Sequence, residues 1–105
     1  MQLRDIDLNL LVVFNQLILD RRVSAVAETL GITQPAVSNA LKRLRVLLND
    51  DLFLRTSHGM APTPFAQQLA EPVAYALGTI HGALNQQTSF DPATSKRTFT
   101  LAVSD

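Results

Sequence analysis

The chain has 105 residues, of which 47% are hydrophobic and 17% charged, with nine basic and nine acidic residues and a formal net charge of zero. This length allows one small domain with a modest core, and the absence of cysteine excludes disulfides, thiol catalysis and cysteine-ligated metal sites. The sequence contains neither a membrane-spanning apolar run nor a signal segment, so we expect a cytoplasmic protein without a membrane partner.

The first expected element is a helix over residues 5–19. Asp5 or Asp7 can cap it, because a carboxylate accepts hydrogen bonds from the free N–H groups of the first turn. Apolar residues recur here at helical spacing and should pack on the core; they are Leu10, Leu11, Phe14, Leu17 and Ile18. Residues 20–22 then form a polar break.

A short helix, a glycine-containing turn and a second helix follow. Ser24 is expected to cap the short helix, and Gly31 ends it. Thr33 is expected to cap the next helix, in which Pro35 stands just inside the start, where a missing N–H costs nothing. We predict that this helix continues through Leu48. Helix, tight turn and helix together form the helix-turn-helix pattern.

The second helix of this motif has two different faces at about 100° per residue. The apolar face is a core stripe of Val37, Ala40, Leu41, Leu44, Leu47 and Leu48. The polar face has no acid and combines short hydrogen-bonding groups with cations; it contains Gln34, Pro35, Ser38, Asn39, Lys42 and Arg45. These groups reach base edges and phosphates in a major groove, so the face predicts DNA binding. A solvated amphipathic helix is the alternative.

The zero net charge argues against nucleic-acid binding by the chain as a whole. DNA attraction would have to come from a local patch. Six cations lie within residues 21–55: Arg21, Arg22, Lys42, Arg43, Arg45 and Arg55.

Residues 49–62 predict a small β-hairpin, or wing. Its strands are Leu52–Thr56 and Met60–Pro62, separated by a turn at residues 57–59. Arg55 stands near the tip, where it would lie along the DNA backbone or in the minor groove; a solvent-facing strand cation is the alternative. His58 has no second ligand at suitable spacing, so no metal site is expected.

Thr63 and Pro64 predict the start of a long helix, as N-cap and first-turn proline. The helix should end near residue 88, and Pro72 should kink it. Packing on its own domain is the alternative to dimerisation, but the apolar stripe is too long for so small a partner. Nine residues keep one heptad register and are expected to form a homodimer interface: Ala66, Leu69, Ala70, Val73, Ala76, Leu77, Ile80, Ala83 and Leu84.

Residues 89–97 predict a hinge, and the alternating segment 98–103 predicts a β-strand. One strand cannot bury itself, so the chain is expected to stop at the edge of another domain. The predicted organisation is a winged helix-turn-helix over 1–62, a linker helix over 63–88, a hinge over 89–97 and the first strand of a truncated domain over 98–105.

Several motifs resemble the N-terminal part of LysR-type transcriptional regulators. The most specific are Thr-Gln-Pro-Ala-Val-Ser at 33–38 and Leu-Phe-Leu-Arg at 52–55, supported by segments at 8–11, 27–30 and 62–64. Residues 3–11, 20–24 and 38–45 extend the resemblance to the NahR and DntR group. That group responds to small aromatic acids or related compounds.

The resemblance implies a set of DNA-binding residues, namely Thr33, Gln34, Pro35, Ser38, Asn39, Lys42, Arg43 and Arg55. Thr33, Lys42 and Arg43 would contact the DNA backbone, and the other helix residues would lie in the groove. Asn39 departs from the Arg or Lys common in the family, which leaves base preference there open. The helix over 63–88 resembles the linker helix that pairs antiparallel in a dimer, and 98–103 resembles the first strand of the effector-binding domain.

These patterns predict a mainly α fold and a sequence-specific regulator that binds double-stranded operator DNA. The resemblance further implies that the full-length protein forms a homodimer or a tetramer and controls aromatic catabolism genes through a small aromatic effector. A helical protein-interaction adaptor, or a compact winged-helix repressor of another family, is the alternative. No enzyme activity and no cofactor are expected, because paired carboxylates, a phosphate-binding loop and a nucleophile elbow are missing.

Overall fold

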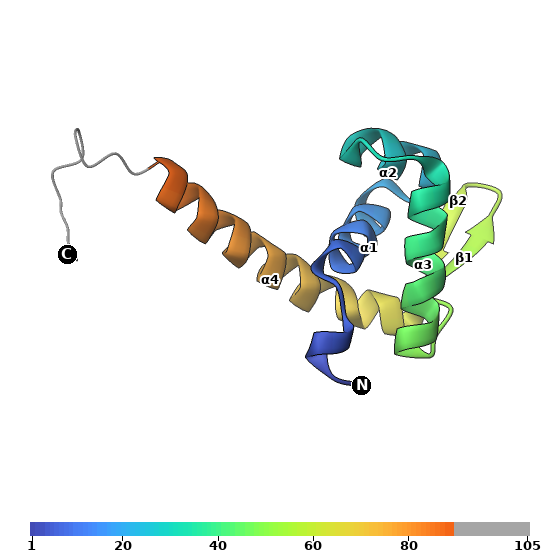
Figure 1. Cartoon of the computed structure of the whole chain (residues 1–105). Helices are drawn as coiled ribbons and strands as arrows, with labels where there is room; N and C mark the ends of the chain where they lie inside the picture. Colours follow the sequence, from blue (N-terminus) through green and yellow to red (C-terminus); the bar gives the residue numbers. More distant parts are fainter. Residues whose placement is uncertain (90–105) are drawn as a thin grey trace, which may run out of the picture. The chain divides into compact units, whose positions relative to one another are not determined.

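The structure, a computed structural model, describes the backbone of residues 1–89 and the side chains of residues 1–86. The predicted strand 98–103, and the predicted hinge beyond Ser89, lie outside the described residues. The elements are η1 (Leu3–Asp5), α1 (Leu8–Asp20), α2 (Val23–Leu30), α3 (Gln34–Leu48), β1 (Phe53–Thr56), β2 (Gly59–Pro62) and α4 (Pro64–Ser89) (Figure 1). The chain divides within α4 into a first unit, residues 1–75, and a second unit that starts at Ala76.

The first helix, α1, begins at Leu8 rather than at residue 5. Asp7 is its N-cap, since Oδ1 of Asp7 accepts a hydrogen bond from the N–H of Asn9 at 2.9 Å. Asp5 instead closes the short 3-10 helix η1. The predicted cap at Asp7 is therefore present, but the predicted start of the helix is wrong.

The start of α2 also differs from the prediction. Arg22 occupies the N-cap position in an extended conformation, and its side chain makes no capping hydrogen bond. Ser24 lies inside the first turn of the helix, so its predicted role as N-cap is wrong. α2 therefore begins without the side-chain acceptor that usually satisfies the first N–H groups.

The turn between α2 and α3 has the predicted chemistry. Gly31 ends α2 with a left-handed φ of 69°, which glycine adopts without strain. The N–H of Ile32 donates to the carbonyl of Ala27 at 3.0 Å and closes the end of α2. Thr33 caps α3, because its Oγ1 accepts a hydrogen bond from the N–H of Ala36 at 3.2 Å.

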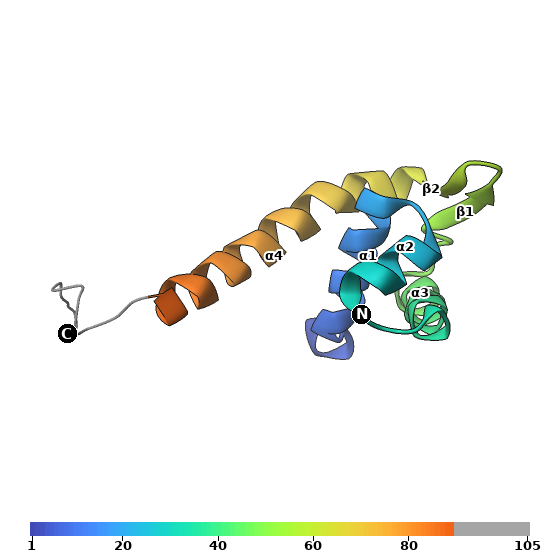
Figure 2. The same cartoon turned by 90° about the horizontal axis from the view of Figure 1, so that it is seen from above.

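The core of the first unit forms where α1, α2 and α3 pack on one another (Figure 2). Phe14 and Phe53 are both fully buried, with ring centroids 5.7 Å apart, so the base of the wing shares the helical core. Full burial of each such side chain stabilises the fold by about 1.5–3 kcal/mol. The buried apolar residues are Leu10, Val13, Phe14, Leu17, Val26, Ala27, Val37, Leu41, Leu44, Leu52, Phe53, Met60, Ala66 and Val73.

The predicted wing is an antiparallel hairpin. Phe53 pairs with Pro62 and Thr56 with Gly59, which leaves residues 57–58 as the turn. The first strand begins at Phe53 and not at Leu52, because Leu52 has a left-handed φ of 64°. Leu52 is nevertheless fully buried, so it anchors the hairpin to the core.

A close backbone contact fixes the wing to the end of α1. The N–H of Met60 donates to the carbonyl oxygen of Arg21 at 2.7 Å. Gly59 has a φ of 121°, and a Cβ at this position would lie 2.5 Å from the same oxygen. Only glycine fits both the conformation and the contact.

Thr63 caps the long helix α4, as predicted. Its Oγ1 accepts a hydrogen bond from the N–H of Ala66 at 3.1 Å and donates to Oδ1 of Asp50 at 2.7 Å. α4 continues across Pro72. Ala66 and Val73 are buried in the first unit, with 0% and 7% exposure. These members of the predicted dimer stripe are therefore buried within their own chain, and the dimer interface itself stays a prediction.

The second unit contains the rest of the described helix. Most of its predicted stripe is exposed in the single chain, namely Ala76, Ile80, Ala83 and Leu84, while Leu77 is half-buried. Among the described helices, none is long and apolar enough to cross a membrane.

Candidate nucleic-acid interface

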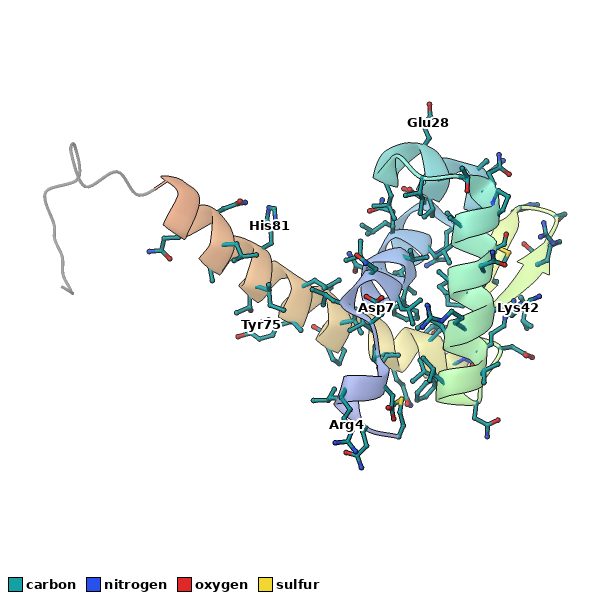
Figure 3. All side chains as sticks on the ribbon, viewed as in Figure 1. Arg4, Asp7, Glu28, Lys42, Tyr75 and His81 are labelled. Atoms are coloured by element: carbon teal, nitrogen blue, oxygen red, sulfur yellow. The ribbon has the colours of Figure 1, made fainter. Side chains whose placement is uncertain are left out.

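The polar face of α3 is open to solvent. Five polar or cationic residues are exposed on it together with Pro35, namely Gln34, Ser38, Asn39, Lys42 and Arg43. Lys42 projects outward from the helix (Figure 3). Because these residues are exposed along one helix, they can contact the groove of a DNA duplex at the same time.

A polar groove lies between α3 and the wing and has a volume of about 320 Å³. Gln34 and Ser38 line it from α3, and Arg55 lines it from β1. The structure therefore brings predicted helix contacts and the predicted wing cation to one surface. The full lining is Arg22, Val23, Ser24, Gln34, Ser38, Arg55, Gly59 and Met60.

The charged side chains that line this groove are all basic. Its lining contains the guanidinium groups of Arg22 and Arg55 and no carboxylate. Hydroxyl and amide groups from Ser24, Ser38 and Gln34 supply the remaining polar atoms. A surface with this composition favours an anion with many acceptor oxygens, as the phosphates of DNA are.

Arg22 was predicted only as one cation of the local basic patch, and neither Arg22 nor Ser24 was assigned a DNA contact. The sequence nevertheless carried a signal, because Arg22 directly precedes a helix where Ser, Thr, Asp or Asn is preferred. Ser24 was instead assigned to that preferred position. The groove forms because the wing lies beside the start of α2.

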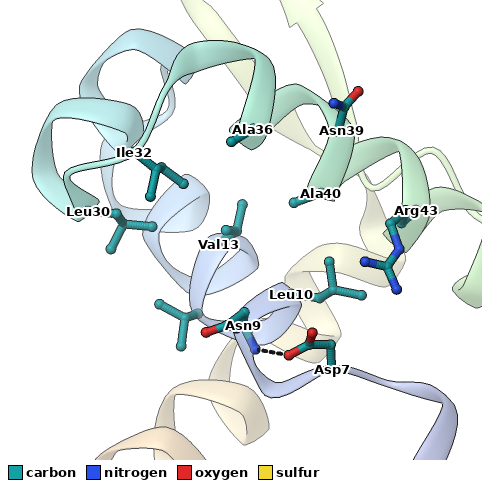
Figure 4. A pocket seen from close by; sticks show the side chains of 11 residues that line it. Asp7, Asn9, Leu10, Val13, Leu30, Ile32, Ala36, Asn39, Ala40 and Arg43 are labelled. Atoms are coloured by element: carbon teal, nitrogen blue, oxygen red, sulfur yellow. Dashed lines mark hydrogen bonds between the residues drawn. The ribbon is translucent and has the colours of Figure 1, made fainter.

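The opposite side of α3 borders an apolar pocket of about 470 Å³ (Figure 4). Leu10 and Val13 of α1 form its floor, and Asn39 and Arg43 of α3 stand at its edge (Figure 4). Asn39 and Arg43 are thus absent from the lining of the polar groove. The predicted contacts are therefore divided between two sides of α3. Neighbouring residues on a helix, such as Lys42 and Arg43, point about 100° apart.

Arg45 does not belong to the exposed face. Its Nε donates to the carbonyl of Asp51 and its Nη2 to the carbonyl of Phe53, each at 2.8 Å. The side chain is half-buried and holds the backbone that leads from α3 into the wing. Its placement on the exposed face is therefore wrong, because two N–H groups of the guanidinium already donate to these carbonyl groups.

No group of three His, Cys, Asp or Glu side chains within the described residues is arranged to hold a metal ion. His58 lies in the turn of the wing, where its Nδ1 is 3.1 Å from Oγ of Ser57.

Comparisons with known proteins agree with this geometry. Residues 8–67 match the family described as bacterial regulatory helix-turn-helix protein, lysR family. The chain is 70% identical over 105 residues to the HTH-type transcriptional activator NagR of Ralstonia sp, and 67% identical over 105 residues to the HTH-type transcriptional activator NahR of Pseudomonas putida. These matches cover 100% of the chain but 35% of each relative, so the chain spans about a third of their length.

Solved structures give the same fold. The probable transcriptional regulator PA0477 from Pseudomonas aeruginosa matches with a TM-score of 0.79 and 46% identity, over 92% of this chain and 33% of that one. A complex of BenM_DBD with benA site 1 DNA matches with a TM-score of 0.71 and 20% identity, over 79% of this chain and 96% of that one. At that lower identity the second match supports the fold alone.

Proposed function

The chain belongs to the LysR family of bacterial regulatory helix-turn-helix proteins, and we propose that it is the DNA-binding and dimerisation part of a sequence-specific transcriptional regulator. The observation that carries this proposal is the exposed polar face of α3 beside the acid-free groove that contains Arg55. A protein that acts on the chromosome works in the bacterial cytoplasm. The curated relatives named above are transcriptional activators, which supports a regulatory role.

In this proposal α3 lies in the major groove of DNA. The amide of Gln34 has the donor and acceptor pair that reads adenine, and Ser38 and Asn39 reach neighbouring base edges. Lys42 and Arg43 bind phosphates on the two sides of the helix, and Arg55 follows the backbone from the wing. Thr33 keeps its hydroxyl hydrogen for a phosphate, because its oxygen already accepts the capping bond of α3.

Salt dependence of binding to any DNA tests the phosphate role. Lys42→Ala should reduce the slope of log K against log salt concentration by about 0.9 for each DNA-binding unit (residues 1–62), because one fewer counterion is released. The ratio of the variant's affinity for specific DNA to its affinity for random DNA should stay unchanged, because Lys42 is proposed to read no base. Fluorescence anisotropy at several salt concentrations measures both quantities. An unchanged salt slope would remove Lys42 from the interface.

We also propose a homodimer in which the exposed later part of the α4 stripe pairs with a second copy. Ile80 and Leu84 are large apolar side chains with 42% and 62% exposure. Two heads joined in this way would read two half-sites of one operator. A longer protein that contains this chain, as long as the relatives named above, would form this dimer or a tetramer.

The regulator as a whole is proposed to respond to a small aromatic effector and to control aromatic catabolism genes, as its resemblance to the NahR and DntR group suggests. The effector would bind in the C-terminal domain beyond residue 105. Residues 1–105 should therefore bind DNA with the same affinity with or without an aromatic acid such as salicylate. Calorimetry should show no saturable heat, and a reproducible micromolar response from this chain would contradict the proposal.

A further inference from the structure

The polar groove has a second basic border, at the start of α2. Arg22 and Ser24 line the groove from the start of α2, and Gln34 and Ser38 line it from α3. Arg55 of the wing lines the same groove. Cations from two separate elements therefore flank side chains that are proposed to read bases.

We propose that Arg22 is a further DNA-contacting residue, which binds a backbone phosphate at the α2 edge of the polar groove, with the hydroxyl of Ser24 as a second donor. This inference rests on the proposed function, because it assumes that α3 lies in a DNA groove. A phosphate next to that groove then approaches the only strongly charged groups in the lining, Arg22 and Arg55. Guanidinium groups match phosphate oxygens in geometry as well as in charge.

A role in capping α2 does not account for Arg22. The side chain is exposed and supplies no capping acceptor at the start of α2. A cation at this position also faces the positive end of the helix dipole, which is unfavourable for stability. Its Cγ comes within 3.5 Å of the point where a Cβ on Gly59 would stand, so packing of the stem over the wing is the structural alternative.

Arg22→Ser separates the two explanations, because the proposal predicts effects of opposite sign. Serine can cap α2, so the melting temperature of residues 1–105 should rise by about 2–8 °C. DNA affinity should fall by about 8-fold for each DNA-binding unit at 0.1 M salt, and the loss should be equal for specific and random DNA. The slope of log K against log salt concentration should be smaller by about 0.9. Loss of stem packing alone would instead lower the melting temperature and leave the salt slope unchanged.

Two further variants control for charge, and a third tests the hydroxyl of Ser24. Arg4→Ser makes the same change in net charge in η1, outside the groove lining, and should leave the salt slope at the wild-type value (Figure 3). Arg22→Lys keeps the cation and should retain the wild-type slope, because the slope counts neutralised phosphates. Ser24→Ala should weaken binding without changing the slope.

The experiment is anisotropy on one operator fragment and one random fragment, from 0.05 to about 0.3 M salt, the range over which the slope is resolved. A flatter slope and a higher melting temperature for Arg22→Ser support the proposal. An unchanged slope, or a lower melting temperature, overturns it. If wild-type protein itself shows no salt-dependent binding, the proposed function fails as well, whereas normal wild-type binding with an unchanged Arg22→Ser slope rejects only the role of Arg22.

Discussion

Leu52 holds an unusual backbone conformation at the junction of helix and wing. Its φ is 64°, and the N–H of Phe53 donates to the carbonyl of Asp51 at 2.6 Å, which closes a tight three-residue turn. The left-handed region costs a residue with a Cβ about 1–2 kcal/mol. Full burial of the leucine side chain, worth about 1.5–3 kcal/mol, offsets that cost.

Replacement of Leu52 by glycine and by alanine separates strain from burial. Both variants lose the buried side chain, at about 2–5 kcal/mol for Leu→Ala. Leu52→Gly should nevertheless be the more stable of the two by about 1 kcal/mol, because glycine accepts the positive φ. Urea unfolding of both variants measures the difference.

Leu44 supplies the matched control, since it is equally buried but lies inside α3. At this position the Leu44→Gly variant should be less stable than the Leu44→Ala variant by about 1 kcal/mol, as in any helix interior. If glycine is the worse residue at both positions, Leu52 stores no backbone strain.

The same residue shows what the sequence could not reveal. Leucine has no preference for a left-handed φ, so Leu52 was predicted as the first residue of a strand. Arg45 gave a similar error, because a cation on a polar helix face looks free until a loop places carbonyl groups beside it. Both errors arise from tertiary contacts that local pattern does not encode.

At the scale of elements, capping chemistry predicted the structure best. Thr33 stands two residues before Pro35 and Thr63 directly before Pro64, in the pattern of N-cap and first-turn proline, and both helices begin where expected. α2 was misread because its N-cap is Arg22, an uncommon cap, and Ser24 offered a conventional alternative. The polar groove depends on that unexpected start.

The long helix shows a limit of periodicity. A heptad stripe looks the same in sequence whether it packs inside the chain or against a second copy. Ala66 and Val73 pack inside, whereas Ile80 is exposed. Burial in the folded unit was needed to separate the residues that pack inside the chain from those that remain exposed.

At the scale of the whole molecule, Ile80→Asp tests the proposed dimer. An interface residue changed to aspartate must bury an unpaired charge, which costs several kcal/mol. Light scattering should show a dimer for the wild-type chain and a monomer for Ile80→Asp, with weaker operator binding because the heads no longer share one site.

Gly82→Asp is the matched control on the other side of α4, where an added Cβ meets nothing within 4 Å. It introduces the same charge about 200° around the helix from Ile80 and should remain dimeric. A dimer for Ile80→Asp as strong as for Gly82→Asp would place the interface elsewhere.

The central claim is that α3 reads DNA sequence, and recovery of bound sites from a random double-stranded pool tests it most directly. Wild-type protein should enrich one motif, and Gln34→Ala should lose base preference at a position of that motif, at about 1–3 kcal/mol of discrimination. Lys42→Ala should enrich the wild-type motif with lower yield. The absence of any enriched motif for the wild-type protein, or an identical motif for Gln34→Ala, would contradict the account.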